Sequence, residues 1–311
     1  MNYCVGIDIG GTTVKCGLFQ EDGVLLDKWE VKTRTENNGE RILPDVAEAV
    51  LAKLAEKKIA KEEVLGAGVG VPGPVNDEGE IPYAVNLQWG YKHIAKELRE
   101  LLDLPVRVGN DANVAALGEM WKGGGAGTKN LVMVTLGTGV GGGVIVNGRM
   151  VAGAHGAGGE IGHACVDPKE PETCNCGNNG CLEQMASATG IVRLAKQELA
   201  KSQQDSVLRK ESLSAKAVFD AYKDGDELAA IVVDRFAEYL GNALGFVAAV
   251  VDPEVFVIGG GVSKAGTALL ECIGKYYRRY AFTACKETPL VLATLGNDAG
   301  IYGAARLALG E

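Results

Sequence analysis

Apolar runs separated by turn residues at the start of the chain predict a group of short strands. Residues 3–9, 14–19 and 24–26 are apolar, and stretches rich in glycine, threonine or acidic residues separate them. Apolar runs bounded in this way are typical of strands joined by tight turns. Residues 41–59 differ, because their apolar positions recur at helical spacing. The pattern therefore predicts three strands followed by a helix.

Strand and helix patterns continue to alternate towards the middle of the chain. Residues 64–71 and 105–108 are expected to be strands, and residues 92–102 place apolar side chains on one face of a helix. A further helix is expected to open at Asn110-Asp111 and to run through Trp121. This alternation is typical of α/β proteins.

Residues 131–150 repeat the order of the opening segment. An apolar strand leads to the turn Gly137-Thr138-Gly139, a second strand follows, and Asn147-Gly148 forms the next turn. We interpret the repeat as an internal duplication of one β-hairpin unit, placed at the head of two related halves.

The remainder of the chain is predicted to be mainly helical, with two further strands. The expected elements are helices at 183–201 and 226–251, a strand at 253–258, a helix from 264, a strand at 290–295 and a closing helix to 309. A polar loop is expected at 202–214.

Composition contributes mainly by what it excludes. The 311 residues suffice for two domains, and their net charge of −9 without a long basic run makes nucleic acid an unexpected partner. No stretch approaches about twenty consecutive apolar residues, and the N-terminus has no signal-peptide pattern, so no membrane span and no export are expected. The eight cysteines include several that stand singly in apolar surroundings, which favours reduced thiols and a cytoplasmic location.

The glycine-rich turns are candidate phosphate-binding loops. The first turn contains Gly10, Gly11, Thr12 and Thr13, and the second contains Thr138 and Gly139. Each offers backbone N–H groups and hydroxyls to a phosphate, although a plain hairpin is the alternative for either turn alone. Two such turns in the same position of a duplicated unit favour a nucleotide. The strand that ends at Gly259-Gly260-Gly261 before a helix is a third loop of nucleotide-binding type.

A cluster of one histidine and three cysteines is the candidate metal site. His163, Cys174, Cys176 and Cys181 form a closed tetrahedral ligand set for zinc, with no position open to a reacting water. We therefore expect a structural Zn²⁺; reduced cysteines in a surface loop are the alternative. Two carboxylates, Glu160 and Glu183, flank the cluster.

Asp111 lies where α/β proteins gather ligand-binding groups, at the carboxyl end of a strand and the start of a helix. The alternative for this residue is an N-cap, which is the commonest use of aspartate at a helix start.

Seven motifs occur together and in one order along the chain. They are DIGGTTVK at 8–15, GVPGPV at 70–75, NDANVAALGE at 110–119, LGTGVGGG at 136–143, GGEIGH at 158–163, CNCGNNGCLE at 174–183 and IGGGVS at 258–263. This set resembles the ROK family of bacterial sugar kinases and regulators over nearly the whole chain. GGEIGH followed by CLEQMASATGIVRLAK is most similar to the ROK-type glucokinases within that family.

The resemblance implies an actin-like ATPase fold, in which two duplicated ribonuclease-H-like α/β domains are separated by a cleft. It implies a small domain at 1–109, completed by a C-terminal helix at about 297–311, and a large domain at 110–296 that carries the zinc loop. It also suggests a homo-oligomer, either a dimer or a tetramer.

The resemblance further implies transfer of the γ-phosphoryl group of ATP to the 6-hydroxyl of glucose, with Asp111 as the general base and Mg²⁺ held at Asp8. The implied sugar contacts are Gly73, Asn86, Asn110, Asp111, Glu160, His163 and Glu183. The implied nucleotide contacts are Asp8, Gly10, Gly11, Thr12, Thr13, Lys15, Thr138, Gly139, Gly260 and Gly261. The alternatives are the same chemistry on N-acetylmannosamine, fructose or mannose, and a non-catalytic sugar sensor. A repressor is not expected, because Asp8 follows only seven residues and leaves no room for a DNA-binding segment.

Overall fold

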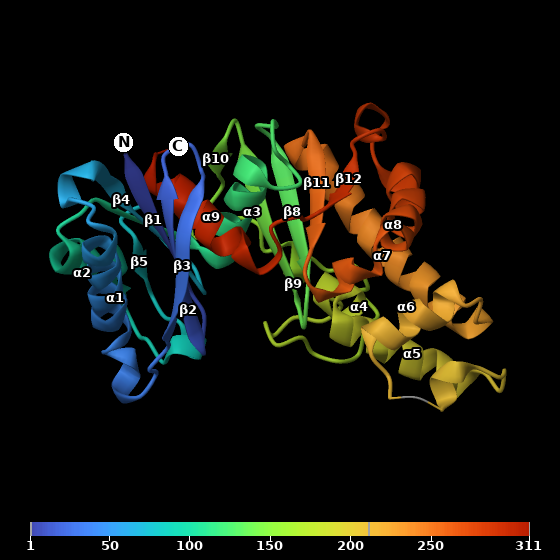
Figure 1. Ribbon diagram of the computed structural model, residues 1–311. Coiled ribbons are helices and arrows are strands. Elements are labelled where there is room, and N and C mark those ends of the chain that lie inside the picture. The colour runs from blue at the N-terminus through green and yellow to red at the C-terminus, as the bar shows by residue number, and fades with distance from the viewer. Residues whose placement is uncertain (1, 211, 311) are drawn as a thin grey trace. The chain divides into compact units, whose positions relative to one another are not determined.

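The computed structural model describes residues 2–210 and 212–310 and contains two five-stranded sheets. The first sheet has the order β3-β2-β1-β4-β7. Figure 1 labels β1, β2, β3 and β4 of this sheet. Its strands are β1 (Tyr3–Ile9), β2 (Thr13–Gln20), β3 (Leu25–Lys32), β4 (Val64–Val71) and β7 (Val106–Asn110). β1 to β3 form an antiparallel meander, and β1, β4 and β7 run parallel to one another.

The second sheet repeats this order as β10-β9-β8-β11-β12. Its strands are β8 (Leu131–Leu136), β9 (Val140–Val146), β10 (Arg149–Met150), β11 (Val255–Gly259) and β12 (Leu290–Leu292). β9 and β10 are antiparallel, whereas β8, β11 and β12 are parallel. In the first sheet β1 pairs with β4, and in the second β8 pairs in the same way with β11. The predicted duplication and the predicted fold class are therefore confirmed.

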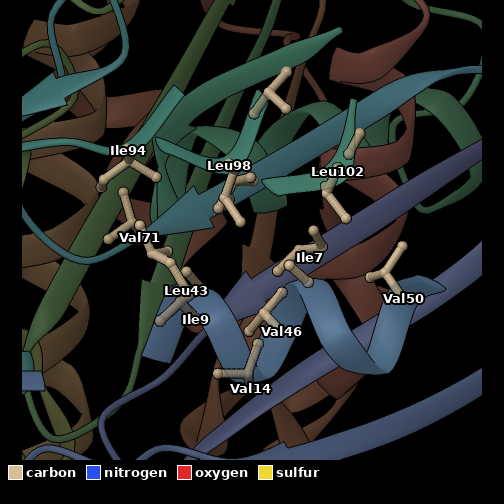
Figure 2. Close-up of a cluster of buried hydrophobic side chains, with 14 of the residues drawn as sticks. Ile7, Ile9, Val14, Leu43, Val46, Val50, Val71, Ile94, Leu98 and Leu102 are labelled. Carbon is tan, nitrogen blue, oxygen red and sulfur yellow. The ribbon is translucent and has the colours of Figure 1, made fainter. Parts of the chain in front are cut away.

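The two faces of the first sheet are covered by different helices because side chains alternate along β1. Ile7 and Ile9 point to α1 (Ile42–Lys57) and α2 (Ile94–Leu102), and Figure 2 shows them among the apolar side chains of those helices. Cys4, on the other face, packs with α9 (Ala299–Ala308). Asp8 has the same parity as Cys4 and therefore lies on the α9 face.

Glycine lets α9 approach the sheet and its neighbouring helix α3 (Asp111–Lys122) very closely. A Cβ built on Gly6 would lie 2.0 Å from the carbonyl oxygen of Ile301, and one built on Gly303 would lie 1.6 Å from that of Val114. Any larger residue at either position would push the helix away.

The remaining helices are α4 (Leu182–Ala186), α5 (Ala188–Lys201), α6 (Ala215–Lys223), α7 (Glu227–Val251) and α8 (Thr267–Tyr280). β5 (Glu80–Ile81) and β6 (Lys92–His93) form a separate two-stranded sheet. In the part of the chain that the structure describes, no helix is both long and apolar enough to cross a bilayer.

Several boundaries differ from those expected. The helix predicted at 183–201 is interrupted at Ser187, whose hydroxyl caps α5 by accepting from the Gly190 N–H at 2.9 Å. The predicted strand at 290–295 ends at Leu292, and the helix expected from 264 begins at Thr267 after a 3₁₀ turn at Gly261–Ala265. The helix α6 was not predicted.

The chain divides by its contacts into two compact units. The first comprises residues 1–129, 143–159 and 294–311, and the second comprises residues 130–142 and 160–293. This division follows the packing of the chain. The predicted domains, residues 1–109 with about 297–311 and residues 110–296, stay a prediction.

Candidate functional site

The first Gly/Thr turn is closed by its own backbone and held by Thr33, which directly follows β3. The Gly10 N–H donates to the Thr13 carbonyl at 3.1 Å. Thr33, which is buried at the end of β3, donates its hydroxyl to the Gly10 carbonyl at 2.7 Å and its N–H to the Thr12 carbonyl at 3.0 Å. These hydrogen bonds engage the carbonyls of Gly10, Thr12 and Thr13 and stabilise the turn.

Asp8 sits beside this turn in a setting that disfavours its charge. Burial and the Asp111 carboxylate raise the pKa of Asp8 to about 6, and the Lys15 ammonium partly counters them. Lys15 is the cross-strand partner of Asp8 and donates to the Asn297 carbonyl at 3.0 Å. A Cβ on Gly300 would lie 2.5 Å from the Asp8 carboxylate, so the start of α9 closely abuts this acid.

Asn110 and Asp111 occupy successive positions at the start of α3 and have different roles there. Asn110 is the N-cap: its Oδ1 accepts from the N–H groups of Ala112 and Asn113 at 3.0 and 3.2 Å. Its Nδ2 donates to the Gly73 carbonyl at 3.1 Å. Asp111 is the first helical residue, and its Oδ1 accepts from Ala112 at 2.8 Å. The capping role considered for Asp111 therefore belongs to Asn110.

The loop that carries Asn86 lies against the first turn. A Cβ on Gly11 would be 3.3 Å from the Asn86 carbonyl oxygen. The exposed Asn86 is held in a 3₁₀ turn at Val85–Leu87, and the loop is anchored where the Trp89 Nε1 donates to the Gly39 carbonyl at 3.1 Å. Gly73 has φ +106°, and a Cβ there would lie 3.0 Å from the Tyr83 carbonyl oxygen, which explains the need for glycine.

The second Gly/Thr turn is built against Glu183 and the start of α5. The Glu183 Oε2 accepts from the Val140 N–H at 3.1 Å, and a Cβ on Gly139 would lie only 1.9 Å from that oxygen. The Thr189 hydroxyl donates to the Thr138 carbonyl at 2.8 Å. Glycine at position 139 thus lets a carboxylate reach the turn.

The four predicted metal ligands come together in one place. One ligand atom from each of His163, Cys174, Cys176 and Cys181 lies within 4.8 Å of all the others. The Cys176 and Cys181 sulfurs are 3.5 Å apart, and tetrahedral zinc with Zn–S bonds of about 2.3 Å would space them by about 3.8 Å. The donor set and its spacing therefore fit zinc.

The two ring nitrogens of His163 face different partners. Nδ1 lies 3.8 Å from the Cys174 sulfur, whereas Nε2 lies 3.8 Å from a carboxylate oxygen of Glu160. The Cys174 sulfur is also 3.9 Å from the Glu183 Oε1. The cluster therefore contacts both flanking carboxylate-bearing segments, as the sequence suggested.

Two helices of the second unit anchor the loop that carries the cysteines. Arg193 of α5 pairs with Glu170, whose carboxylate is buried, and Tyr239 of α7 donates to Asp167 at 3.0 Å. Burial and the hydrogen bond to Asp167 raise the pKa of Tyr239 and keep its phenol protonated as the donor. These anchors need no metal.

Gly260 and Gly261 follow β11 beside a pocket of about 350 Å³. Gly260 has φ +83°, and a Cβ there would lie 2.5 Å from the Leu136 carbonyl oxygen. Gly261 faces open space, and the pocket is lined by Gly261, Val262, Ala188 and α6 residues including Ala215 and Phe219. The walls are mostly apolar, which suits the flat face of a nucleobase.

The structure thus gathers the predicted residues into groups within each unit. In the first unit the Asn86 loop lies against the first turn, Gly73 is bound to Asn110, and Asp8 interacts electrostatically with Asp111. In the second, Glu183 joins the second turn to the Cys/His cluster with His163 and Glu160.

The supporting residues Thr33 and Asn113 were not predicted. Asn113 is buried, donates to the Gly158 carbonyl at 3.2 Å and accepts from the Val144 N–H at 3.3 Å, so it fixes the chain just before Glu160. For Asn113 the one signal in the sequence was a polar residue three places after Asn110 on an otherwise apolar helix face.

Nearly the whole chain is similar to proteins of one known family. The family profile described as ROK family matches residues 4–311. The chain is 44% identical to a glucokinase of Halalkalibacterium halodurans, covering 97% of this chain and 93% of that protein. It is 37% identical to a glucokinase of Thermotoga maritima, covering 97% and 96%. The crystal structure of a ROK family glucokinase from Streptomyces griseus, in complex with glucose and AMPPNP, has a TM-score of 0.74 and 32% identity, covering 98% of this chain and 99% of that one.

Proposed function

This chain belongs to the ROK family, and from that premise we propose that it is a glucokinase, an ATP:D-hexose 6-phosphotransferase that converts glucose to glucose 6-phosphate. Identity along nearly the full length of two glucokinases supports glucose as the substrate, and the likeness to a structure holding glucose and AMPPNP supports ATP as the donor.

The placement of Asp111 carries the assignment of the base. A primary hydroxyl is a weak nucleophile, and a carboxylate within hydrogen-bond reach accelerates its attack by taking the proton. Asp111 is the first residue of α3, after the N-cap Asn110. Its carboxylate raises the pKa of Asp8, which lies beside the first Gly/Thr turn. Asp111 therefore takes the proton of the 6-hydroxyl as this oxygen attacks the γ-phosphorus of ATP.

Phosphoryl transfer needs oriented donors more than covalent help from the protein. Backbone N–H groups and hydroxyls of Gly10, Gly11, Thr12 and Thr13 meet the phosphates, together with Lys15 and the turn residues Thr138 and Gly139. Asp8 would hold the Mg²⁺ that accompanies ATP, whose charge offsets that of the phosphate oxygens when it is bound. Gly260 and Gly261 lie against the adenosine, whose base enters the 350 Å³ pocket.

Hexose recognition requires many short polar contacts because a sugar offers hydroxyls and little apolar area. The motif match supports the following residues as these contacts: Gly73, Asn86, Asn110, Asp111, Glu160, His163 and Glu183. His163 can serve metal and sugar at once, since its Nδ1 faces Cys174 and its Nε2 faces away from that sulfur towards Glu160.

His163, Cys174, Cys176 and Cys181 would hold a structural Zn²⁺. Three thiolates and one imidazole would fill its four ligand positions, so such an ion would bind no reacting water. Its contribution is to hold the segment between His163 and Glu183 in one conformation.

We also infer that the chain associates with a second copy through the C-terminal half of α7. This half carries no charged residue from Tyr239 to Val251, yet Phe246 and Val250 are 68% and 86% exposed. Gly245 abuts Tyr280 and Ala281, so the exposed Phe282 borders the same surface. Two copies of an apolar helix face of this kind can pack against each other about a two-fold axis, which would bury the face on both chains.

Phe246→Lys should shift the protein to a smaller species in light scattering coupled to size exclusion, because it places a charge in this surface. Val207→Lys, at a valine that is 49% exposed elsewhere, is the matched control and should not change the mass. An unchanged mass for the Phe246 variant would rule out this surface as the interface.

We propose two domains, residues 1–109 with the helix at about 297–311, and residues 110–296.

The proposed glucokinase activity is tested by a coupled assay of ADP release with ATP and a panel of glucose, mannose, fructose, N-acetylmannosamine and N-acetylglucosamine. Glucose should give the highest kcat/KM. A clear preference for an N-acetylated sugar would replace the substrate but keep the reaction, and no ADP release with any sugar would leave a non-catalytic sensor.

A further inference from the structure

Cys165 is an exposed thiol beside the Cys/His cluster but outside its ligand set. Among the eight cysteines, all within the described part of the chain, only Cys165 and Cys176 are exposed. Cys176 belongs to the four proposed ligands, and Cys165 does not. Cys165 follows His163 by two residues and so lies in the segment that presents the sugar-binding side chains.

The backbone places Cys165 directly opposite Cys181. The two residues form an antiparallel bridge. The flanking hydrogen bonds run from the Val166 N–H to the Gly180 carbonyl at 2.7 Å and from the Leu182 N–H to the Ala164 carbonyl at 2.9 Å. This pattern defines a non-hydrogen-bonded pair, in which the Cα atoms are about 4.5 Å apart and both side chains leave on the same face.

That spacing lies inside the range that a disulfide requires, which is about 4.4–6.8 Å between Cα atoms. The Cys165 sulfur also leans towards the opposite strand, since a Cβ on Gly180 would lie 3.3 Å from it. A rotation about the side-chain bonds can therefore join the two sulfurs without moving the backbone pairing.

We propose that Cys165 is an oxidative modification site, at which hydrogen peroxide initiates a Cys165–Cys181 disulfide that removes Cys181 from the metal ligand set. The consequence for the metal rests on the proposed zinc site, whereas the disulfide itself does not. The Cys165 sulfur attacks one peroxide oxygen and the O–O bond breaks. One water molecule is released, and Cys165 becomes a sulfenic acid. The Cys181 sulfur then attacks the Cys165 sulfur, the S–S bond forms, and the S–O bond breaks to release a second water. Two thiols lose two electrons and one peroxide is reduced to two waters.

The disulfide would act on the sugar-binding segment. Loss of Cys181 leaves three of four ligands, which no longer close a tetrahedral site. Cys181 is the N-cap residue of α4, and Glu183 stands two residues later on that helix. Oxidation should therefore weaken glucose binding more than nucleotide binding. A thiol reductant would reverse the bond by thiol–disulfide exchange.

Peroxide treatment of the purified full-length protein, followed by non-reducing peptide mapping, tests the proposal. We expect a cross-linked peptide pair joining Cys165 to Cys181, removed by dithiothreitol. A chromogenic zinc indicator should report release of bound zinc in parallel, at least ~5-fold more slowly for Cys165→Ser than for the wild type. Cys272→Ser, which removes a partly exposed thiol outside this segment, is the matched control and should behave as the wild type.

The competing product is a bond between Cys176 and Cys181, whose sulfurs are already 3.5 Å apart. If that pair is the main cross-link, or if Cys165→Ser forms disulfide and loses zinc as fast as the wild type, the proposal is wrong. Protein isolated without zinc would refute the metal site, and the peptide map would still decide the disulfide.

Discussion

Single residues in the first unit show how neighbouring side chains of similar size take separate roles. The Asn110 side-chain amide caps α3 through its oxygen and donates to the Gly73 carbonyl through its nitrogen. Asp111, one residue later, is close enough to Asp8 to raise the pKa of that acid. The sequence predicted that both residues belong to the site, but a capping pattern alone could not assign the cap to one of two adjacent Asx residues.

The raised pKa of Asp8 has a measurable effect on stability. Burial and the Asp111 charge raise this pKa from 3.8 to about 6, so the folded state disfavours the ionised carboxylate. The resulting loss of stability is absent below the unfolded pKa, develops between about pH 4 and 6, and is complete above pH 6. Asp8→Asn should therefore raise the free energy of unfolding by roughly 1–3 kcal/mol at pH 8 in magnesium-free buffer, and by clearly less at pH 5.

Urea unfolding at the two pH values measures this difference. Asp205→Asn, at an exposed aspartate, changes the net charge equally and should leave stability unchanged. An Asp8 variant that is less stable than the wild type at pH 8 would contradict the electrostatic account. The same variant should lose activity, so stability and function oppose each other at this residue.

At the scale of elements, the turns depend on glycines that admit a specific neighbour. The predicted turns were confirmed because glycine and threonine between apolar runs leave few other conformations. Their supports were harder to predict. Thr33 and Asn113 act through carbonyls that are distant in sequence, and no local pattern indicates which carbonyl a buried hydroxyl or amide will face. The break at Ser187 was missed because apolar spacing continues across it.

Gly139→Ala should weaken glucose binding with little effect on folding. The added methyl group would overlap the Glu183 carboxylate, which can swing away because it is the end of a flexible side chain. We expect the KM for glucose to rise roughly 10-fold or more while the melting temperature changes little. Gly137→Ala is the matched control in the same turn, since its Cβ meets nothing within 4 Å. Equal kinetics for the two variants would show that Glu183 does not depend on this glycine.

The proposed zinc site predicts a separation between sugar and nucleotide binding. Cys174→Ser removes a proposed ligand, whose sulfur lies 3.8 Å from the His163 Nδ1 and 3.9 Å from the Glu183 Oε1. The variant should contain much less than one zinc per chain by elemental analysis, and its KM should rise for glucose far more than for ATP. The anchors at Glu170 and Asp167 should keep the rest of the unit folded. A zinc content matching that of the wild type would refute the ligand set.

At the scale of the whole molecule, two copies of one strand order carry two Gly/Thr turns. The duplication was visible in the sequence because both hairpins keep the order strand, Gly/Thr turn, strand and turn. The sequence could not reveal how closely α9 returns to the first sheet. That contact depends on Gly6 and Gly303, which have no side chain to contribute to a hydrophobic pattern.

The catalytic role of Asp111 is the central claim, and the kinetics of Asp111→Asn with glucose and ATP test it most directly. The amide keeps the size of the side chain but cannot take a proton from the 6-hydroxyl. We predict a fall in kcat of at least ~10²-fold, with glucose binding still measurable by calorimetry. Asp103→Asn, at an exposed aspartate that ends α2, is the control and should retain wild-type kcat. A kcat within a few-fold of the wild type for Asp111→Asn would contradict the account.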